Sequence, residues 1–254
     1  MNARKVKKIL ISQPKPSSEK SPYFDIAGKY HLDIHFYPFI KVERVSLKEF
    51  RQQRINILEF TAIVFTSRTA VDNFFSICEE LKITIPDTMK YFCISEIVAL
   101  YLQKYIVYRK RKIFFSQTGK IEGLDSFFTK HSKEKFLFPV PEEHNEDVFD
   151  LLIEKKLKYT TSIMYRTVSN VFPKDEKMDY DLIIFFSPLG IQSLMKNFPD
   201  YNQGNAAIGC FGNATAKAIE EAGLRVDFEA PQPEYPSMTA ALEAYLKDNH
   251  KHHS

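Results

Sequence analysis

Two serines in this sequence directly follow short apolar runs and precede residues with helical spacing. Ser187 comes after the apolar run 182–186 and is followed by Pro188, and Ser67 comes after the run 61–66. Serine is a favourable N-cap, and proline fits the first position of a helix. The backbone N–H groups at such a helix start lack intrahelical partners and, with the helix dipole, attract anions. Both serines therefore predict contacts to an anionic ligand, although helix capping alone would also explain them.

The two serine segments belong to an internal repeat. Three pairs of segments match in the same order at offsets of 117 to 127 positions: 8–11 with 135–138, 61–75 with 181–195, and 93–99 with 210–216. An ordered set of matches at a nearly constant offset predicts a duplicated half.

Strands and helices alternate along the chain. Short apolar or β-branched runs predict strands at 6–12, 31–39, 61–66, 89–94, 105–108, 136–139, 159–168, 181–186, 206–211 and 224–228. Helical spacing and caps predict helices at 22–27, 69–81, 96–104, 125–131, 145–156, 189–198, 214–222 and 237–248. This alternation predicts an α/β fold of parallel sheets with helices on both faces. Right-handed crossovers would then bring the serine and glycine loops to one edge of each sheet.

Composition excludes several classes of protein. The 254 residues are 44% hydrophobic and 26% charged, which predicts a globular chain with room for two domains. No apolar run approaches the 18 residues of a membrane span, and the apolar stretch 9–12 is too short for a signal peptide, so we expect a cytoplasmic location. Cys78, Cys93 and Cys210 lack paired spacing and predict reduced core residues.

The charge pattern and the motifs give no support to other chemistries. A net charge of +3 does not predict nucleic-acid binding, and the one basic cluster, 109–112, reads as a solvated turn. The histidines lack metal-ligand spacing, which predicts no metal site. The serines lie outside a Gly-x-Ser-x-Gly motif, and no glycine-rich phosphate loop is present.

Several of these loops together resemble the uroporphyrinogen-III synthase family. The similar segments are Phe65-Thr66-Ser67 with Ala70-Val71, Phe185-Phe186-Ser187-Pro188 with Gly190, Tyr165-Arg166-Thr167, and Gly209 through Gly212-Asn213-Ala214-Thr215-Ala216. The unit Gly212-x-x-Thr215-Ala216 is the most specific of them. The resemblance extends from about Val6 to Leu246.

The resemblance implies two similar α/β domains joined by a two-stranded linker, with the substrate between them. One domain would be discontinuous and comprise 1–39 and 168–254, and the other would comprise 43–163. The linker strands would be 40–42 and 164–167.

The resemblance also implies an activity. The substrate would be hydroxymethylbilane, a linear tetrapyrrole polycarboxylate, which the enzyme closes to uroporphyrinogen III with inversion of the last ring. No cofactor or metal would be needed, and the enzyme would act as a monomer without membrane or nucleic-acid partners. Tyr165 would be the catalytic group, assisting loss of water from the hydroxymethyl group. The expected substrate-binding residues are Ser12, Thr66, Ser67, Arg68, Ser95, Ser187, Pro188, Gly190, Gly212, Asn213, Ala214 and Thr215.

Alternatives remain open at this point. Tyr165 could simply pack against its neighbours in a linker strand. The expected Gly-x-x-Thr-Ala motif of the second domain is replaced by Ser95-Glu96-Ile97-Val98-Ala99, and Glu96 would repel a carboxylate. A non-catalytic two-domain ligand-binding or regulatory relative would explain this departure, and an unrelated two-domain binder of small anions is a third hypothesis.

Overall fold

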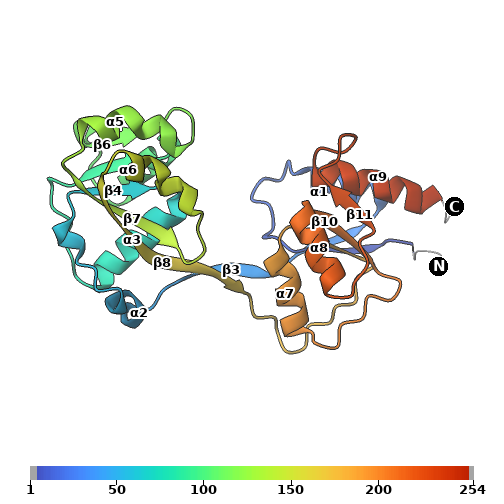
Figure 1. Cartoon of the computed structure of the whole chain (residues 1–254). Helices are drawn as coiled ribbons and strands as arrows, with labels where there is room; N and C mark the ends of the chain where they lie inside the picture. Colours follow the sequence, from blue (N-terminus) through green and yellow to red (C-terminus); the bar gives the residue numbers. More distant parts are fainter. Residues whose placement is uncertain (1–4, 252–254) are drawn as a thin grey trace. The chain divides into compact units, whose positions relative to one another are not determined.

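The computed structural model describes residues 5–251, so the outermost residues of the predicted discontinuous domain lie outside the described residues. The chain divides into two compact units, a first unit formed by the chain up to Lys41 together with the chain from Val168, and a second unit, Val42–Thr167 (Figure 1). Each unit is a sheet of predominantly parallel strands with helices on both faces, which confirms the predicted α/β class.

The first unit contains a five-stranded sheet in the order β11-β10-β9-β1-β2, and its neighbouring strands pair in parallel. Its strands are β1 (Lys8–Ile11), β2 (Asp33–Phe36), β9 (Leu182–Phe185), β10 (Ala207–Phe211) and β11 (Phe228–Ala230). Its helices are α1 (Pro22–Tyr30), α7 (Pro188–Asn197), α8 (Asn213–Glu221) and α9 (Met238–Lys251).

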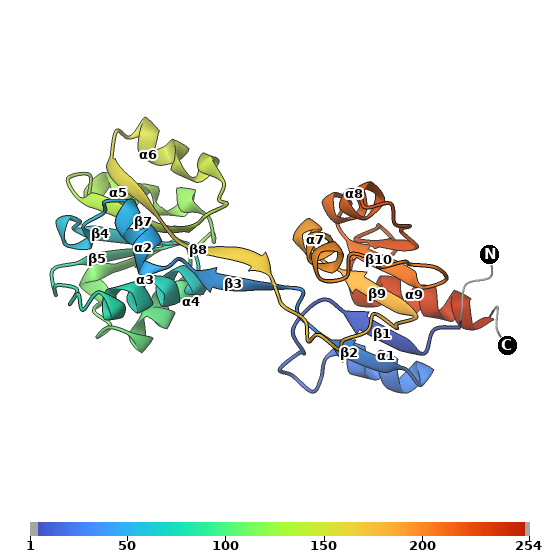
Figure 2. The ribbon, with the colours of Figure 1, turned by 90° about the horizontal axis from the view of Figure 1, so that it is seen from below.

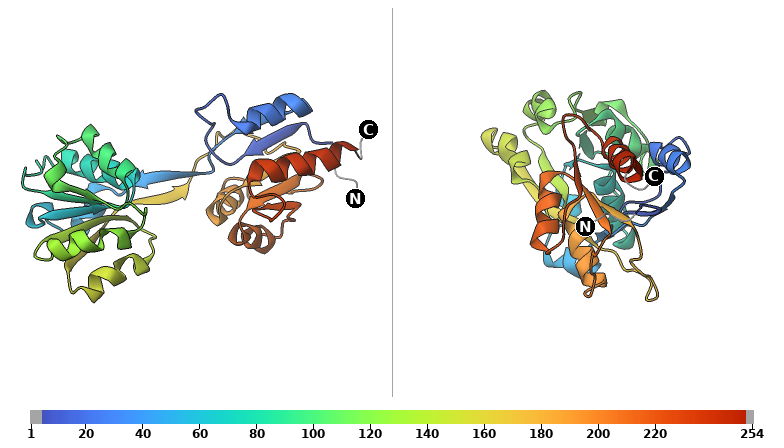
Figure 3. Two further views of the ribbon diagram at one scale, coloured as in Figure 1. Left: turned by 90° about the horizontal axis from the view of Figure 1, so that it is seen from above. Right: turned by 90° about the vertical axis from the view of Figure 1, so that its right-hand side faces the viewer.

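The strands of this sheet are apolar on both faces because helices cover both. Ile9 and Leu182 pack with α1 and α9, which can be followed in Figure 3 by their blue and red colours. On the other face, Leu10, Ile183 and Ile208 pack with α7 and α8.

The second unit contains a six-stranded sheet in the order β3-β8-β7-β4-β5-β6 (Figure 2). Its strands are β3 (Ile40–Arg44), β4 (Ala62–Phe65), β5 (Lys90–Cys93), β6 (Ile113–Phe115), β7 (Lys135–Pro141) and β8 (Lys158–Ser169). Its helices are α2 (Leu47–Gln52), α3 (Arg68–Glu80), α4 (Glu96–Tyr101), α5 (Asp125–Lys130) and α6 (Asp150–Glu154). Side chains of α2, α3 and α4 share one core cluster with one face of the sheet, and side chains of α5 and α6 share another with the opposite face.

The predicted linker segments lie in β3 and β8, which are neighbours in the sheet of the second unit. The division into units places residues 40–41 with the first unit and residues 42 and 164–167 with the second.

Strand order reveals the predicted repeat. The first unit reads β11-β10-β9-β1-β2 and the second, from its other edge, reads β6-β5-β4-β7-β8-β3. Each strand of the first unit therefore has a counterpart at the same place, and β3 is additional. The matched segments occupy matched strands, namely β9 with β4, β10 with β5 and β1 with β7. Each unit nevertheless combines strands from both sequence halves, because β1 pairs with β9 and β4 pairs with β7.

Several predicted elements were wrong in detail. Residues 105–108 form no strand, and Ile113–Phe115 pairs with β5 instead; the side chain of Ile113 is buried, whereas Val107 is 77% exposed. The strand predicted at 224–228 is found at Phe228–Ala230. Helix α1 continues through Gly28 to Tyr30, and His31, at φ 52°, adopts the left-handed conformation at its end. The helix predicted at 145–156 consists of a 3-10 turn, Glu146–Phe149, followed by α6.

The three cysteines are free and buried, so they are core residues as predicted. Among the helices of residues 5–251, none has both the length and the apolar character that crossing a membrane requires.

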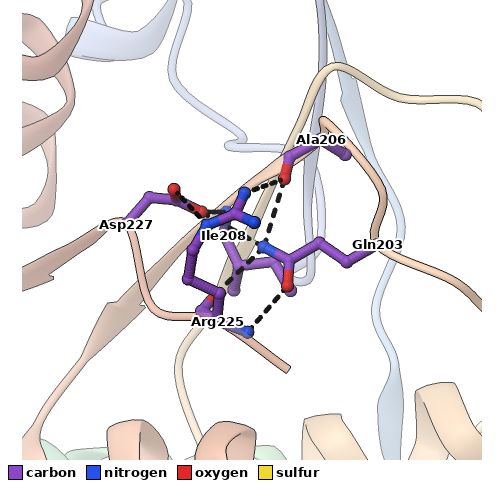
Figure 4. Close-up of polar contacts among 5 residues, drawn as sticks. All are labelled: Gln203, Ala206, Ile208, Arg225 and Asp227. Atoms are coloured by element: carbon purple, nitrogen blue, oxygen red, sulfur yellow. Dashed lines mark hydrogen bonds and ion pairs between the residues drawn. The ribbon is translucent and has the colours of Figure 1, made fainter. Parts of the chain in front are cut away.

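A buried polar network joins the loops that precede β10 and β11 in the first unit (Figure 4). The Gln203 side-chain amide donates to the carbonyls of Ala206 (3.1 Å) and Arg225 (3.0 Å), and its oxygen accepts from the Arg225 N–H (2.7 Å). Asp227 accepts from the Ile208 N–H (2.8 Å) and from Arg225 Nε (2.8 Å). Gln203 thus satisfies the Arg225 N–H and carbonyl, which its loss would leave without a protein partner, whereas the Ala206 carbonyl also accepts from Arg225 Nη2 (3.0 Å).

We expect Gln203→Ala to lower the free energy of unfolding by about 1–3 kcal/mol, because buried polar groups would lose their partners. Urea unfolding followed by circular dichroism measures this change. Asn205→Ala is the matched control, since Asn205 is an exposed amide in the same loop and should stay within about 0.5 kcal/mol of the parent. An equal effect of the two substitutions would contradict the structural role of Gln203.

Candidate functional site

The start of α3 lies at the carboxyl end of β4 in the second unit. Ser67 has an extended backbone, and its Oγ accepts a hydrogen bond from the Ala70 N–H (3.0 Å), so it caps the helix as predicted. The Val71 N–H donates to the Ser67 carbonyl (3.2 Å). Within residues 5–251, the N–H groups of Arg68 and Thr69 have no hydrogen-bond partner. They are therefore free to bind an anion at the positive end of the helix dipole.

Tyr165 of β8 contacts this helix start. Its hydroxyl lies 3.4 Å from Ser67 Oγ, although the two residues are 98 positions apart in the chain. The side chain is only 8% exposed, and burial raises the pKa of the Tyr165 phenol, which more than offsets the lowering by the Ser67 hydrogen bond. The phenol is therefore protonated at neutral pH and can donate a hydrogen bond beside the free N–H groups.

Arg68 is held by an aromatic ring that the sequence analysis did not single out. Its guanidinium carbon lies 5.7 Å from the centre of the Tyr101 ring. The carboxylate of Asp72, one turn further along α3, accepts hydrogen bonds from the hydroxyls of Tyr101 (2.9 Å) and Tyr105 and from Lys104 Nζ (2.9 Å). Burial acts to raise the pKa of Asp72, but these hydrogen bonds outweigh it and lower the pKa. The ionised carboxylate thus ties α4 and the turn after it to α3. In the sequence, the four-residue spacing that places Arg68 and Asp72 on one helix face was the signal that could have indicated this cluster.

Arg166, the neighbour of Tyr165, is neutralised by two carboxylates. Its Nη2 lies 2.6 Å from Glu49 Oε1, and its Nε lies 3.0 Å from Glu142 Oε2. Hydrogen bonds from Ser46 and Arg166 lower the pKa of Glu49 to about 2. The cation nearest to Tyr165 in the sequence is therefore already paired.

Thr66 and Ser95 occupy the same edge of the second unit. Thr66 is half-buried between β4 and Ser67. Ser95 caps α4 by accepting from the Val98 N–H (3.4 Å), but α4 has only six residues and Glu96 is exposed in its first turn. A carboxylate at that position repels an anion, so this helix start suits the predicted ligand less well than α3 does.

Three predicted positions follow neighbouring strands of the first unit. Ser12 follows β1, Ser187 follows β9 and Gly212 follows β10, all at the same edge of the sheet. Ser187 Oγ accepts from the Gly190 N–H (3.3 Å), and Pro188 is the first helical residue, as predicted. The side chain of Ser12 is only 7% exposed. A Cβ on Gly190 would lie 3.3 Å from the Phe185 ring, so this glycine serves close packing.

The turn at Gly212 presents backbone N–H groups without a side-chain cap. Gly212 has φ 87°, a left-handed conformation that favours glycine. Asn213 and Ala214 are exposed, and within residues 5–251 their N–H groups have no partner. Thr215 is 2% exposed; its hydroxyl donates to the Phe211 carbonyl (2.9 Å) and its N–H to the Gly212 carbonyl (2.9 Å). Thr215 therefore holds the turn, and the two residues before it are the ones able to contact an anion.

Comparisons with known proteins point to one family. The family model for uroporphyrinogen-III synthase HemD matches residues 26–240. The uroporphyrinogen-III synthase of Schizosaccharomyces pombe is 23% identical over 244 residues, covering 90% of this chain and 93% of the relative. The crystal structure of uroporphyrinogen-III synthetase from Helicobacter pylori has a similar fold, with a TM-score of 0.57 and 19% identity, and the match covers 95% of this chain and 99% of that one.

The family model covers most of the chain, including α3, Tyr165 and the Gly212 turn. The chain therefore belongs to the uroporphyrinogen-III synthase family.

Proposed function

We propose that the chain catalyses the cyclisation of hydroxymethylbilane to uroporphyrinogen III with inversion of the terminal pyrrole ring, a step of tetrapyrrole biosynthesis. The observation that carries this proposal, beside the family match, is the Tyr165 hydroxyl 3.4 Å from Ser67 Oγ at a helix start with free N–H groups. A protonated phenol beside anion-binding donors suits a polycarboxylate that must lose a hydroxyl group.

The proposed binding groups are backbone donors at helix starts. Arg68 and Thr69 in the second unit, and Asn213 and Ala214 in the first, supply N–H groups without partners among the described residues. Each such helix start contributes about 0.3–1 kcal/mol toward holding a carboxylate. The guanidinium of Arg68 adds a positive charge that is exposed to solvent. Several such contacts together hold a polyanion without a dense cluster of arginines.

In the proposed reaction, the Tyr165 hydroxyl hydrogen-bonds the departing hydroxyl of the substrate, which takes up a proton from solvent and leaves as water. The electron pair of the adjacent pyrrole nitrogen drives this ionisation, and loss of the N–H proton to solvent gives an electrophilic azafulvene. The substituted carbon of the last ring then attacks to form a spiro intermediate, which rearranges to the inverted ring. A buried phenol is a weak acid, so its contribution is orientation and hydrogen bonding more than proton transfer.

We also propose that the enzyme works in the cytoplasm. The three free, buried cysteines support a reducing compartment. The expectation of a monomer stays a prediction.

The first test supplies purified protein with hydroxymethylbilane. We expect the type III isomer to exceed the type I isomer, because spontaneous closure without the enzyme gives type I. Oxidation of the products followed by chromatographic separation of the isomers measures the ratio. Type I alone, as in a reaction without protein, would show that the chain is not a synthase.

Tyr165→Phe tests the proposed role of the phenol. The buried ring is kept and only the hydroxyl is lost, so the fold should persist while kcat falls about ten- to a hundredfold. Tyr159→Phe is the control, because Tyr159 lies in the same strand and stacks on Phe149 away from Ser67. Unchanged turnover of Tyr165→Phe would remove this residue from the mechanism.

Arg68→Gln tests the proposed carboxylate contact. Loss of an exposed cation that binds a substrate carboxylate should raise KM about two- to fivefold and leave kcat nearly unchanged. Steady-state kinetics at low and high salt measure this, and the difference from the parent should shrink at high salt. Arg111→Gln removes an exposed arginine outside the site and serves as the control. A lower kcat with an unchanged KM would contradict a binding role for Arg68.

A further inference from the structure

The second unit contains a cavity at the edge of its sheet opposite to Ser67 and Ser95. Its volume is about 240 Å³, and it is lined by Ile85, Pro86, Asp87, Met89, Tyr91, Tyr105, Ile106, Val107, Arg109, Lys112 and Ile113. Met89 and Tyr91 lie at the amino end of β5, and Ile113 begins β6. Ser67 and Ser95 follow the carboxyl ends of β4 and β5, so the length of the strands separates the cavity from the proposed catalytic edge.

The cavity has both polar and apolar walls, and six of its eleven lining residues are apolar. Met89 and Ile113 belong to the buried core, and Ile85 and Ile106 pack against it. Val107 is 77% exposed, although it lines the same cavity. An exposed valine beside these apolar residues provides a surface that an apolar ligand would cover.

The hydroxyl of one cavity residue, Tyr91, has no hydrogen-bond partner in the described part of the chain. Tyr91 is 5% exposed. Burial raises the pKa of this phenol, so it is neutral at physiological pH and can donate a hydrogen bond. The hydroxyl is not one of the atoms that are buried without a partner, so it is open to the cavity, where a ligand oxygen can accept its hydrogen bond.

The charges of the cavity leave one cation unpaired. Arg109 Nη2 forms an ion pair with Asp87 Oδ2 (3.1 Å), whereas Lys112 has no ion pair among the described residues. These three side chains together carry a net charge of +1. Lys110 and Arg111, the other members of the basic run, are exposed and do not line the cavity. Two of the four cations in the run that the sequence analysis took for a solvated turn therefore line this cavity.

We propose that this cavity binds a small apolar monocarboxylate, with its ring or branched chain against Met89, Ile106 and Ile113 and its carboxylate between Lys112 and the Tyr91 hydroxyl. A single net positive charge and apolar lining residues match one carboxylate on a compact apolar body. They do not match the polycarboxylate chain proposed for the opposite edge. The site is thus separate from the catalytic one and takes a different class of ligand.

Isothermal titration of the full-length protein with 3-phenylpropionate tests the proposal. We expect saturable binding of one molecule per chain, and weaker binding of the neutral analogue 3-phenylpropanamide. Lys112→Gln should weaken binding of 3-phenylpropionate about two- to fivefold, and it should weaken binding of the amide by a smaller factor. Tyr91→Phe removes only the hydroxyl and should weaken binding of both.

Lys110→Gln is the matched control, since it removes an exposed charge of the same run that lies outside the cavity. It should leave the affinity unchanged. A thermal melt of each variant shows that it is folded. Absence of binding at millimolar concentration, or equal weakening by Lys110→Gln and Lys112→Gln, would overturn the proposal. Because the readout is binding of a compound unrelated to hydroxymethylbilane, the result does not depend on the proposed catalytic function.

Discussion

Parallel pairing of the strands is the constraint on which the rest of each unit depends. When neighbouring strands run in one direction, each connection must return along a face of the sheet, and a helix does this while burying that face. Every strand then ends at the same edge, and every following helix begins there. Ser12, Ser187 and Gly212 share an edge of the first unit for this reason, and Thr66, Ser67 and Ser95 share one in the second. No specific contact among these loops is needed to gather them.

The same constraint explains which parts of the fold the sequence could predict. A strand buried on both faces is a continuous apolar run, so β4 and β9 were plain from their residues, and Ser67 and Ser187 marked their ends. Edge strands carry a weaker pattern. Residues 105–108 and 113–115 are both apolar and flank one basic turn, and only pairing with β5 decides that Ile113 enters the sheet. Gly28 was a reasonable helix stop, but with φ outside the left-handed region it continues α1, and His31 takes the left-handed position.

Local sequence likewise predicted some contacts of the candidate site and not others. Helix caps depend on residues within one turn, so the hydrogen bonds of Ser67 to Ala70 and of Ser187 to Gly190 followed from local sequence. The contact of Tyr165 with Ser67 depends on how β8 lies in the sheet, and a family resemblance, not a local pattern, directed attention to Tyr165. The contact of Arg68 with the Tyr101 ring, whose hydroxyl binds Asp72, had only the spacing of Arg68 and Asp72 on one helix face as a signal, because the contact itself arises where α3 and α4 pack together.

The distribution of charge in the second unit favours weak, distributed binding over a single strong anchor. Arg166 adjoins Tyr165, yet Glu49 and Glu142 already neutralise it, so a substrate carboxylate gains little there. The remaining attractive groups at that edge are Arg68 and the backbone donors of α3. Several contacts of about 0.3–1 kcal/mol each hold a flexible substrate chain without binding any single carboxylate tightly. Weak, distributed binding is an advantage for the proposed reaction, since the substrate must bend and the product must leave. Binding that strongly stabilised the extended substrate would raise the barrier to ring closure.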